Sequence, residues 1–153
     1  MDSYQECLKR WHKLVPQEDK DRVFNANLCG IDFSFVGFID TYECLSKLIP
    51  TDWTVFDFGC AYNPQCYFFR EHKAYHAIEP HSFYGECTEL FNTSNTIIHR
   101  CTTKDFLLNE LPKMNINIKK SFAIVNNVPN WYGEDSIKLV HEYFRNCYTF
   151  YIA

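Results

Sequence analysis

Several features that would assign a class at once are missing from this sequence of 153 residues. No apolar run is long enough to span a bilayer, so the sequence indicates no membrane partner. The first residues, MDSYQECLKRWHKL, lack the apolar core of a secretory signal. The net charge of -4 is spread along the chain without a basic run, which gives no reason to favour nucleic acid as a partner. We therefore expect a cytoplasmic protein.

Metal-binding cysteine patterns are absent as well. The sequence has 8 cysteines, yet no two of them form a Cys-x-x-Cys pair, and the cysteines and histidines do not fall at zinc-finger spacing. The cysteines are scattered through apolar segments, which is typical of buried free thiols in a reduced protein. We expect neither a structural metal nor a disulfide framework.

What the sequence does contain is enough apolar material for one core. Apolar residues make up 46% of the chain and aromatic residues 18%, and the length suits a single domain. Residues 1–50 show helical spacing of apolar side chains, notably at 4–15 and 35–49, and predict an N-terminal helical cap. Residues 51–153 predict an α/β core, with strands and helices in alternation.

The alternation contains five short strands and four helical segments. The strands are expected at WTVFDF, YHAIEP, NTIIHRC, SFAIVNNVP and YTFYIA, and the helices at PQCYFFREH, SFYGECTELFN, TTKDFLLNELPKM and DSIKLVHEYFRNC. In the third helix, Thr102 and Asp105 resemble a capping box. Because the strands are nearly continuous apolar runs, they predict a Rossmann-like, doubly wound parallel sheet of about five strands. A ligand crevice is then expected at the carboxyl ends of the strands, where the strand order reverses.

Acidic residues and one glycine mark that crevice. Asp57 lies inside the first strand, and Gly59 follows it, where the backbone can turn sharply and approach a ligand closely. Glu79 ends the second strand, about 20 residues further on, at the place where dinucleotide-binding folds hold ribose hydroxyls. The alternatives without a ligand are a plain turn at Gly59 and a solvated strand end at Glu79.

These motifs resemble the class I S-adenosylmethionine-dependent methyltransferases over roughly residues 51–153. VFDFGCAYN is similar to the family's first motif, YHAIEP to its second, IIHRCTTKDF to its third strand and adenine loop, and FAIVNNVPNW to its fourth strand. The resemblance implies S-adenosylmethionine as cofactor. It implies a set of cofactor-binding residues, which are Asp57, Gly59, Ala61, Glu79, Pro80, Thr102, Thr103 and Asn126.

The sequence also departs from the family pattern. Only Gly59 remains of the usual glycines, with Ala61 and Asn63 at the later places, and Thr102 stands where an acidic residue is often found. The chain ends at the fifth strand, so the resemblance implies a shortened form. A nicotinamide dehydrogenase is a weaker interpretation, because Gly-x-Gly-x-x-Gly does not follow the first strand.

No side chain stands out as catalytic. His76, His81 and His99 lie at expected strand ends, where one could act as a general base, although packed or surface histidines are commoner. Cys60 begins an expected helix, which can lower a thiol pKa, but a small filler is the commoner role. Methyl transfer needs mainly alignment of donor and acceptor, so this absence does not exclude it.

The loop after the fourth strand is equally open to two interpretations. Asn126 and Asn127 could bind the methionine portion or form a turn, and NNVPNW is only faintly similar to the Asn-Pro-Pro-Tyr motif of amino-group methyltransferases. Trp131 and Tyr132 could close a pocket or pack in the core.

Two functions follow as hypotheses. The first is a small methyltransferase acting on a small molecule or a protein side chain. The alternative is a non-catalytic binding protein that kept the fold and lost the reaction. A homodimer could form through the edge of the terminal strand, because an open strand edge invites pairing.

Overall fold

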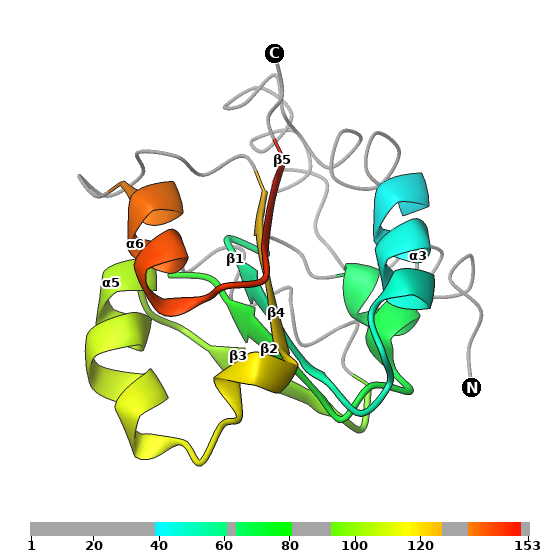
Figure 1. Cartoon of the computed structure of the whole chain (residues 1–153), viewed down its shortest axis with the longest axis horizontal. Coiled ribbons are helices and arrows are strands. Elements are labelled where there is room, and N and C mark those ends of the chain that lie inside the picture. Colours follow the sequence, from blue (N-terminus) through cyan, green and yellow to red (C-terminus); the bar gives the residue numbers. More distant parts are fainter. Residues whose placement is uncertain (1–38, 61–63, 81–92, 127–134, 151–153) are drawn as a thin grey trace, which may run out of the picture.

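The structure is a computed structural model that describes residues 39–60, 64–80, 93–126 and 135–150. These residues form a five-stranded parallel sheet in the order β3-β2-β1-β4-β5. The strands are β1 (Thr54–Phe58), β2 (Ala74–Ile78), β3 (Thr96–His99), β4 (Ser121–Asn126) and β5 (Cys147–Phe150). This confirms the predicted doubly wound sheet, with the order reversing between β1 and β4 (Figure 1).

The helical segments lie on both faces of the sheet. Helix α3 (Ile39–Leu48) and the 3-10 helix η2 (Pro64–Phe69) cover one face. The other face carries α6 (Ser136–Tyr143) and one helical run, which consists of α5 (Thr103–Asp105), the π-helical η4 (Phe106–Glu110) and the 3-10 turn η5 (Leu111–Lys113) (Figure 1). A further 3-10 turn, η6 (Ile118–Lys120), leads into β4.

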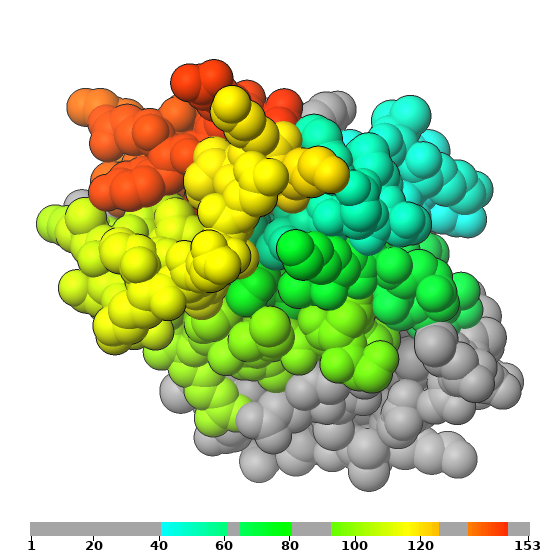
Figure 2. Space-filling view, turned by 60° about the horizontal axis from the view of Figure 1, so that its bottom comes forward, coloured from blue at the N-terminus to red at the C-terminus, as the bar shows by residue number. Residues whose placement is uncertain are grey.

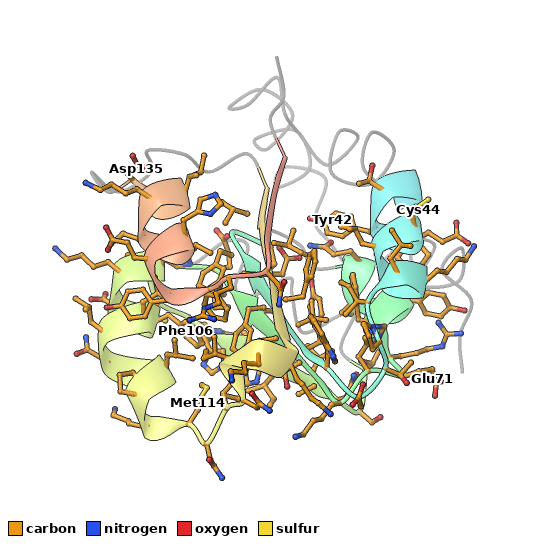
Figure 3. The ribbon with its side chains drawn as sticks, viewed as in Figure 1. Tyr42, Cys44, Glu71, Phe106, Met114 and Asp135 are labelled. Atoms are coloured by element: carbon orange, nitrogen blue, oxygen red, sulfur yellow. The ribbon has the colours of Figure 1, made fainter. Side chains whose placement is uncertain are left out.

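Alternate residues of β1 enter the two layers, as the pleat of a strand requires. Phe56 and Phe58 pack against Phe106 of η4 and against Phe144, with ring centroids between 5.0 and 5.9 Å apart. On the opposite face, Asp57 meets Tyr75 of β2. Figure 3 shows Phe106 and Tyr42 approaching the sheet from its two sides.

Two helices end earlier in the structure than the spacing of their apolar residues predicted. The segment after β1 was expected to be helical to His72, but the 3-10 helix ends at Phe69, and the ring of His72 hydrogen-bonds the carbonyl of Ile49 at 2.9 Å. The last helix ends at Tyr143, because Phe144 is extended, with φ -119° and ψ 127°. Cys147, which falls at helical spacing with Phe144, therefore belongs to β5.

The predicted capping of the helix at Thr102 is confirmed on one side. The Thr102 hydroxyl oxygen accepts a hydrogen bond from the Asp105 N–H at 3.1 Å. Of the expected N-terminal cap, only α3 lies within the described residues. The helix expected at SFYGECTELFN lies outside them.

Candidate functional site

The candidate site is the edge formed by the carboxyl ends of β1, β2 and β4. Asp57 and Gly59 reach this edge from β1, Glu79 and Pro80 directly follow β2, and the backbone of Asn126 ends β4. The register explains this meeting, because Phe58 pairs with both Ile78 and Val125. Ala61, His81, Asn127, Trp131 and Tyr132 lie outside the described residues.

Gly59 makes the turn that the sequence predicted. Its φ is 72°, in the left-handed region that a side chain disfavours. The carbonyl of Ile78 accepts hydrogen bonds from the Gly59 N–H at 2.8 Å and from the Cys60 N–H at 3.3 Å. The chain therefore stays attached to β2 while it turns away from β1.

Asp57 is fully buried in the layer beneath α3 and η2. Its Oδ2 atom accepts a hydrogen bond from Gln65 Nε2 at 2.8 Å and another from the Tyr75 hydroxyl. Its Oδ1 atom is buried without a hydrogen-bond partner. Burial raises the pKa of this carboxyl group from 3.8 to about 6, although the hydrogen bonds from Tyr75 and Gln65 oppose the rise.

Glu79 is also buried, with 3% of its surface exposed. Its N–H donates to the carbonyl of His99 at 3.0 Å, which joins the ends of β2 and β3. This degree of burial argues against the alternative that Glu79 is a solvated strand end. Two carboxyl groups, from neighbouring strands, are thus held away from water at one edge of the sheet.

The surroundings of Cys60 disfavour its reactive thiolate form. Burial raises its pKa well above the usual range, and the nearby charges of Asp57 and Glu79 add to the rise. This favours the commoner role, a small filler, over a thiol whose pKa is lowered at a helix start. Cys60 is therefore a buried filler close to both carboxyl groups.

His76 and His99, on neighbouring strands, are packed side chains of one sheet face. His76 Nδ1 and His99 Nε2 are hydrogen-bonded at 2.9 Å. His76 stacks on Phe56 at 4.7 Å, and His99 meets Phe106 edge-on at 4.8 Å. Burial lowers the pKa of His76 to about 4 and also lowers that of His99, so the pair stays neutral near pH 7.

The predicted third-strand residues lie just beyond β3. Thr102 is partly exposed, and its hydroxyl oxygen caps α5, whereas Thr103 is buried. Their predicted contact with the cofactor stays a prediction. No sequence pattern marks Gln65 and Tyr75 as partners of Asp57, since the three residues lie on different elements and only the fold brings them together.

A groove of about 450 Å³ lies at the opposite edge of the sheet, at the amino ends of the strands. It is lined by Asp52, Thr54, Lys73, Ala74, Asn115, Ile116, Asn117 and Lys120, and Lys120 forms an exposed ion pair with Asp52 at 2.9 Å. Figure 2 turns this edge toward the viewer. The groove is separate from Asp57, Gly59 and Glu79, which reach the other edge.

Within the described residues, no group of three or more histidine, cysteine, aspartate or glutamate side chains could hold a metal ion. Among the described helices, none has the length and apolar character needed to cross a membrane. Cys44, Cys60, Cys66 and Cys101 are not joined in disulfide bonds.

Comparison with solved structures identifies the fold. The plantazolicin methyltransferase BpumL in complex with S-adenosylhomocysteine matches with a TM-score of 0.59 and 14% identity, over 95% of this chain and 57% of that one. BpumL with a monoazolic desmethylPZN analog matches with a TM-score of 0.59 and 16% identity, over 95% and 59% of the two chains. Coclaurine N-methyltransferase bound to N-methylheliamine and S-adenosylhomocysteine matches with a TM-score of 0.57 and 14% identity, over 97% and 51%.

These likenesses show the Rossmann-like fold of the class I methyltransferases, as the sequence motifs predicted. The chain spans between half and three-fifths of the length of these structures. No family model and no curated protein matches the sequence.

Proposed function

We propose that this chain binds S-adenosylmethionine at the carboxyl edge of its sheet and transfers the methyl group to a small molecule or a protein side chain. The observation that carries the proposal is the convergence of Asp57, Gly59 and Glu79 at the point where the strand order reverses. Open α/β sheets bind their ligands at this point. The similar structures support the cofactor, because their own complexes contain S-adenosylhomocysteine.

The described residues fit this cofactor. The missing Cβ at Gly59 leaves the turn open to close approach by a ligand. The Oδ1 atom of Asp57 lacks a hydrogen-bond partner, and an ammonium group of the methionine portion would supply a donor. The carboxyl group of Glu79 would accept from the ribose hydroxyls, as its place after β2 predicts.

The remaining predicted contacts complete the proposed site. Pro80, Thr102 and Thr103 would lie along the adenosine, and Ala61 and Asn126 would lie beside the methionine portion. The bound sulfonium supplies an activated methyl group, so the protein has to orient the acceptor and exclude water. No described side chain is proposed as a general base, since His76 and His99 are occupied with each other in the packed sheet face.

The acceptor is proposed only as a class. BpumL is bound to desmethylPZN analogs and coclaurine N-methyltransferase to N-methylheliamine, so similar folds accommodate small organic ligands. A protein side chain remains the second acceptor of the proposal. Both kinds of acceptor would be brought to the edge where Asp57 and Glu79 lie.

The test is calorimetric titration of the full chain with S-adenosylhomocysteine and S-adenosylmethionine. Glu79→Ala should weaken binding by about 1–3 kcal/mol, the usual cost of leaving a polar group unpaired. Glu142→Ala is the matched control. Glu142 is exposed on α6, which covers the face of the sheet opposite to η2. A wild-type protein that is folded by circular dichroism but binds neither compound would refute the proposal.

A further inference from the structure

Gln65 joins the side chain of Asp57 to the backbone of the loop that follows β1. It is the second residue of η2, and only 4% of its surface is exposed. Its Nε2 atom donates to Asp57 Oδ2 at 2.8 Å and to the carbonyl of Cys60 at 3.0 Å. A side-chain amide carries two N–H donors, so these two bonds use both.

This link completes the attachment of Cys60. Its N–H is already bonded to the carbonyl of Ile78, and Gln65 holds its carbonyl from the other side. The preceding residue, Gly59, has the left-handed conformation that this arrangement needs. The position of the turn therefore depends on Gln65 as well as on β2.

The same link depends on the charge of Asp57. Both described hydrogen bonds to this carboxyl group end on Oδ2, and they favour its ionised form. A hydrogen bond to a carboxylate is roughly twice as strong as one to a neutral acceptor. Protonation of Asp57 would thus weaken the hydrogen bond from Gln65 Nε2 to Asp57 Oδ2.

Two titratable groups, Tyr75 of β2 and Cys60 after β1, interact with the charge of this carboxyl group. Further titratable groups lie next to these two: Tyr42 of α3 acts on Tyr75, and Cys66 of η2 and Glu79 after β2 act on Cys60. Burial raises the pKa of Tyr75 and of Cys60 well above their usual ranges, so both stay neutral at physiological pH. Asp57, whose pKa is about 6, changes charge near neutrality.

We propose that Gln65 is a positioning residue that couples the ionisation of Asp57 to the backbone of the cofactor loop. This inference rests on the proposed function, because the loop matters for ligand affinity only if the donor binds there. The ionised carboxylate holds Gln65, Gln65 holds the Cys60 carbonyl, and the turn at Gly59 is set for the ligand. In acid the carboxyl group is neutral, the turn is less firmly held, and affinity for S-adenosylhomocysteine falls.

Two variants separate this coupling from a general loss of structure. Gln65→Leu and Tyr75→Phe each remove one donor to Asp57 Oδ2, but only Gln65 also contacts the Cys60 carbonyl. Both variants should raise the pKa of Asp57, measured from the ¹³C shift of its carboxyl group. Their effects on the loop should differ.

The ligand readout is the dissociation constant of S-adenosylhomocysteine between pH 5 and pH 8. Gln65→Leu should weaken binding about tenfold at pH 8, which is the cost of one hydrogen bond. It should also reduce the pH dependence of binding to the part that comes from the direct contact of Asp57 with the ammonium group. Tyr75→Phe should keep a pH-dependent profile, with its midpoint moved upward, and should cost less affinity at pH 8. Equal losses with identical profiles in the two variants would overturn the proposal.

A second readout needs no ligand. In the wild type, the backbone amide of Cys60 should shift in ¹⁵N spectra with the same midpoint as the Asp57 carboxyl group, and in Gln65→Leu this response should disappear. If no compound binds at any pH while the Cys60 amide behaves in this way, the proposed function fails and the coupling stands. A Cys60 amide with the same pH response in wild type and Gln65→Leu would refute the coupling.

Discussion

Two buried groups on opposite faces of the sheet should give the protein opposing pH dependences of stability. The pKa of His76 is lowered from 6.5 to about 4, so the unfolded chain binds the proton more tightly and acid favours unfolding. The pKa of Asp57 is raised from 3.8 to about 6, so the folded chain binds the proton more tightly. The stability from Asp57 is present in acid and is lost as the pH rises through about 6.

The two effects nearly cancel between pH 5 and pH 8. Linkage from these pKa values gives a gain of about 2 kcal/mol from His76 and a loss of about 1.5 kcal/mol from Asp57 as the pH rises. Their sum changes the free energy of unfolding by less than about 1 kcal/mol. His99, whose pKa burial also lowers, acts in the same direction as His76.

Substitution of Asp57 or His76 should reveal the pH dependence of stability that the other residue causes. In Asp57→Asn, the free energy of unfolding should rise by at least about 2 kcal/mol from pH 5 to pH 8, because His76 supplies that gain and His99 adds to it. In His76→Asn it should fall over the same range, by as much as about 1.5 kcal/mol, because Asp57 is then opposed only by His99. The quantity to compare is the slope with pH, since each variant also loses packing or hydrogen bonds at every pH.

Urea unfolding at pH 5, 6, 7 and 8 measures these slopes. Asn109→Ala, at an exposed and non-titrating position of η4, should follow the wild-type profile. Parallel profiles for Asp57→Asn and His76→Asn would refute the reasoning, because the burial of these two groups would then not control their protonation.

The remaining predictions concern the core and the turn. Phe106→Ala should cost about 3–5 kcal/mol in urea unfolding, since the fully buried ring contacts Phe56 and Phe58, whereas Leu108→Ala, with 49% of Leu108 exposed, should cost far less. Equal costs would show that the described core does not carry the stability. Gly59→Ala should lower the unfolding free energy by about 1–2 kcal/mol because of its φ of 72°, and a neutral effect in thermal melts would contradict that backbone conformation.

Local signals accounted for most of the architecture. The near-continuous apolar runs WTVFDF, YHAIEP and SFAIVNNVP predicted buried parallel strands, and the spacing of Thr102 and Asp105 predicted the start of α5. The end of α6 was missed because an apolar residue at helical spacing looks the same whether the helix continues or a strand begins. Phe144 is buried in the core although its backbone is extended.

The partners within the site could not be predicted in the same way. Gln65 and Tyr75 meet Asp57 through the packing of η2 and through the register of β1 with β2, and neither lies at a recognisable spacing from it. The contact of His76 with His99 likewise depends on the register of β2 with β3. A sequence pattern shows which residues are polar in an apolar setting, but the partners of those residues are determined by tertiary contacts.

The position of β1 in the sheet has a consequence for how the chain folds. One of its neighbours, β2, is close in sequence, but the other is β4, where Thr54 pairs with Ser121. Pairings between such distant segments slow folding, because a long loop must close before the contact forms. During synthesis, β1 can pair with β2 early, while its other edge stays open until β4 emerges from the ribosome. That interval is when the nascent chain is most exposed to aggregation and most dependent on chaperones.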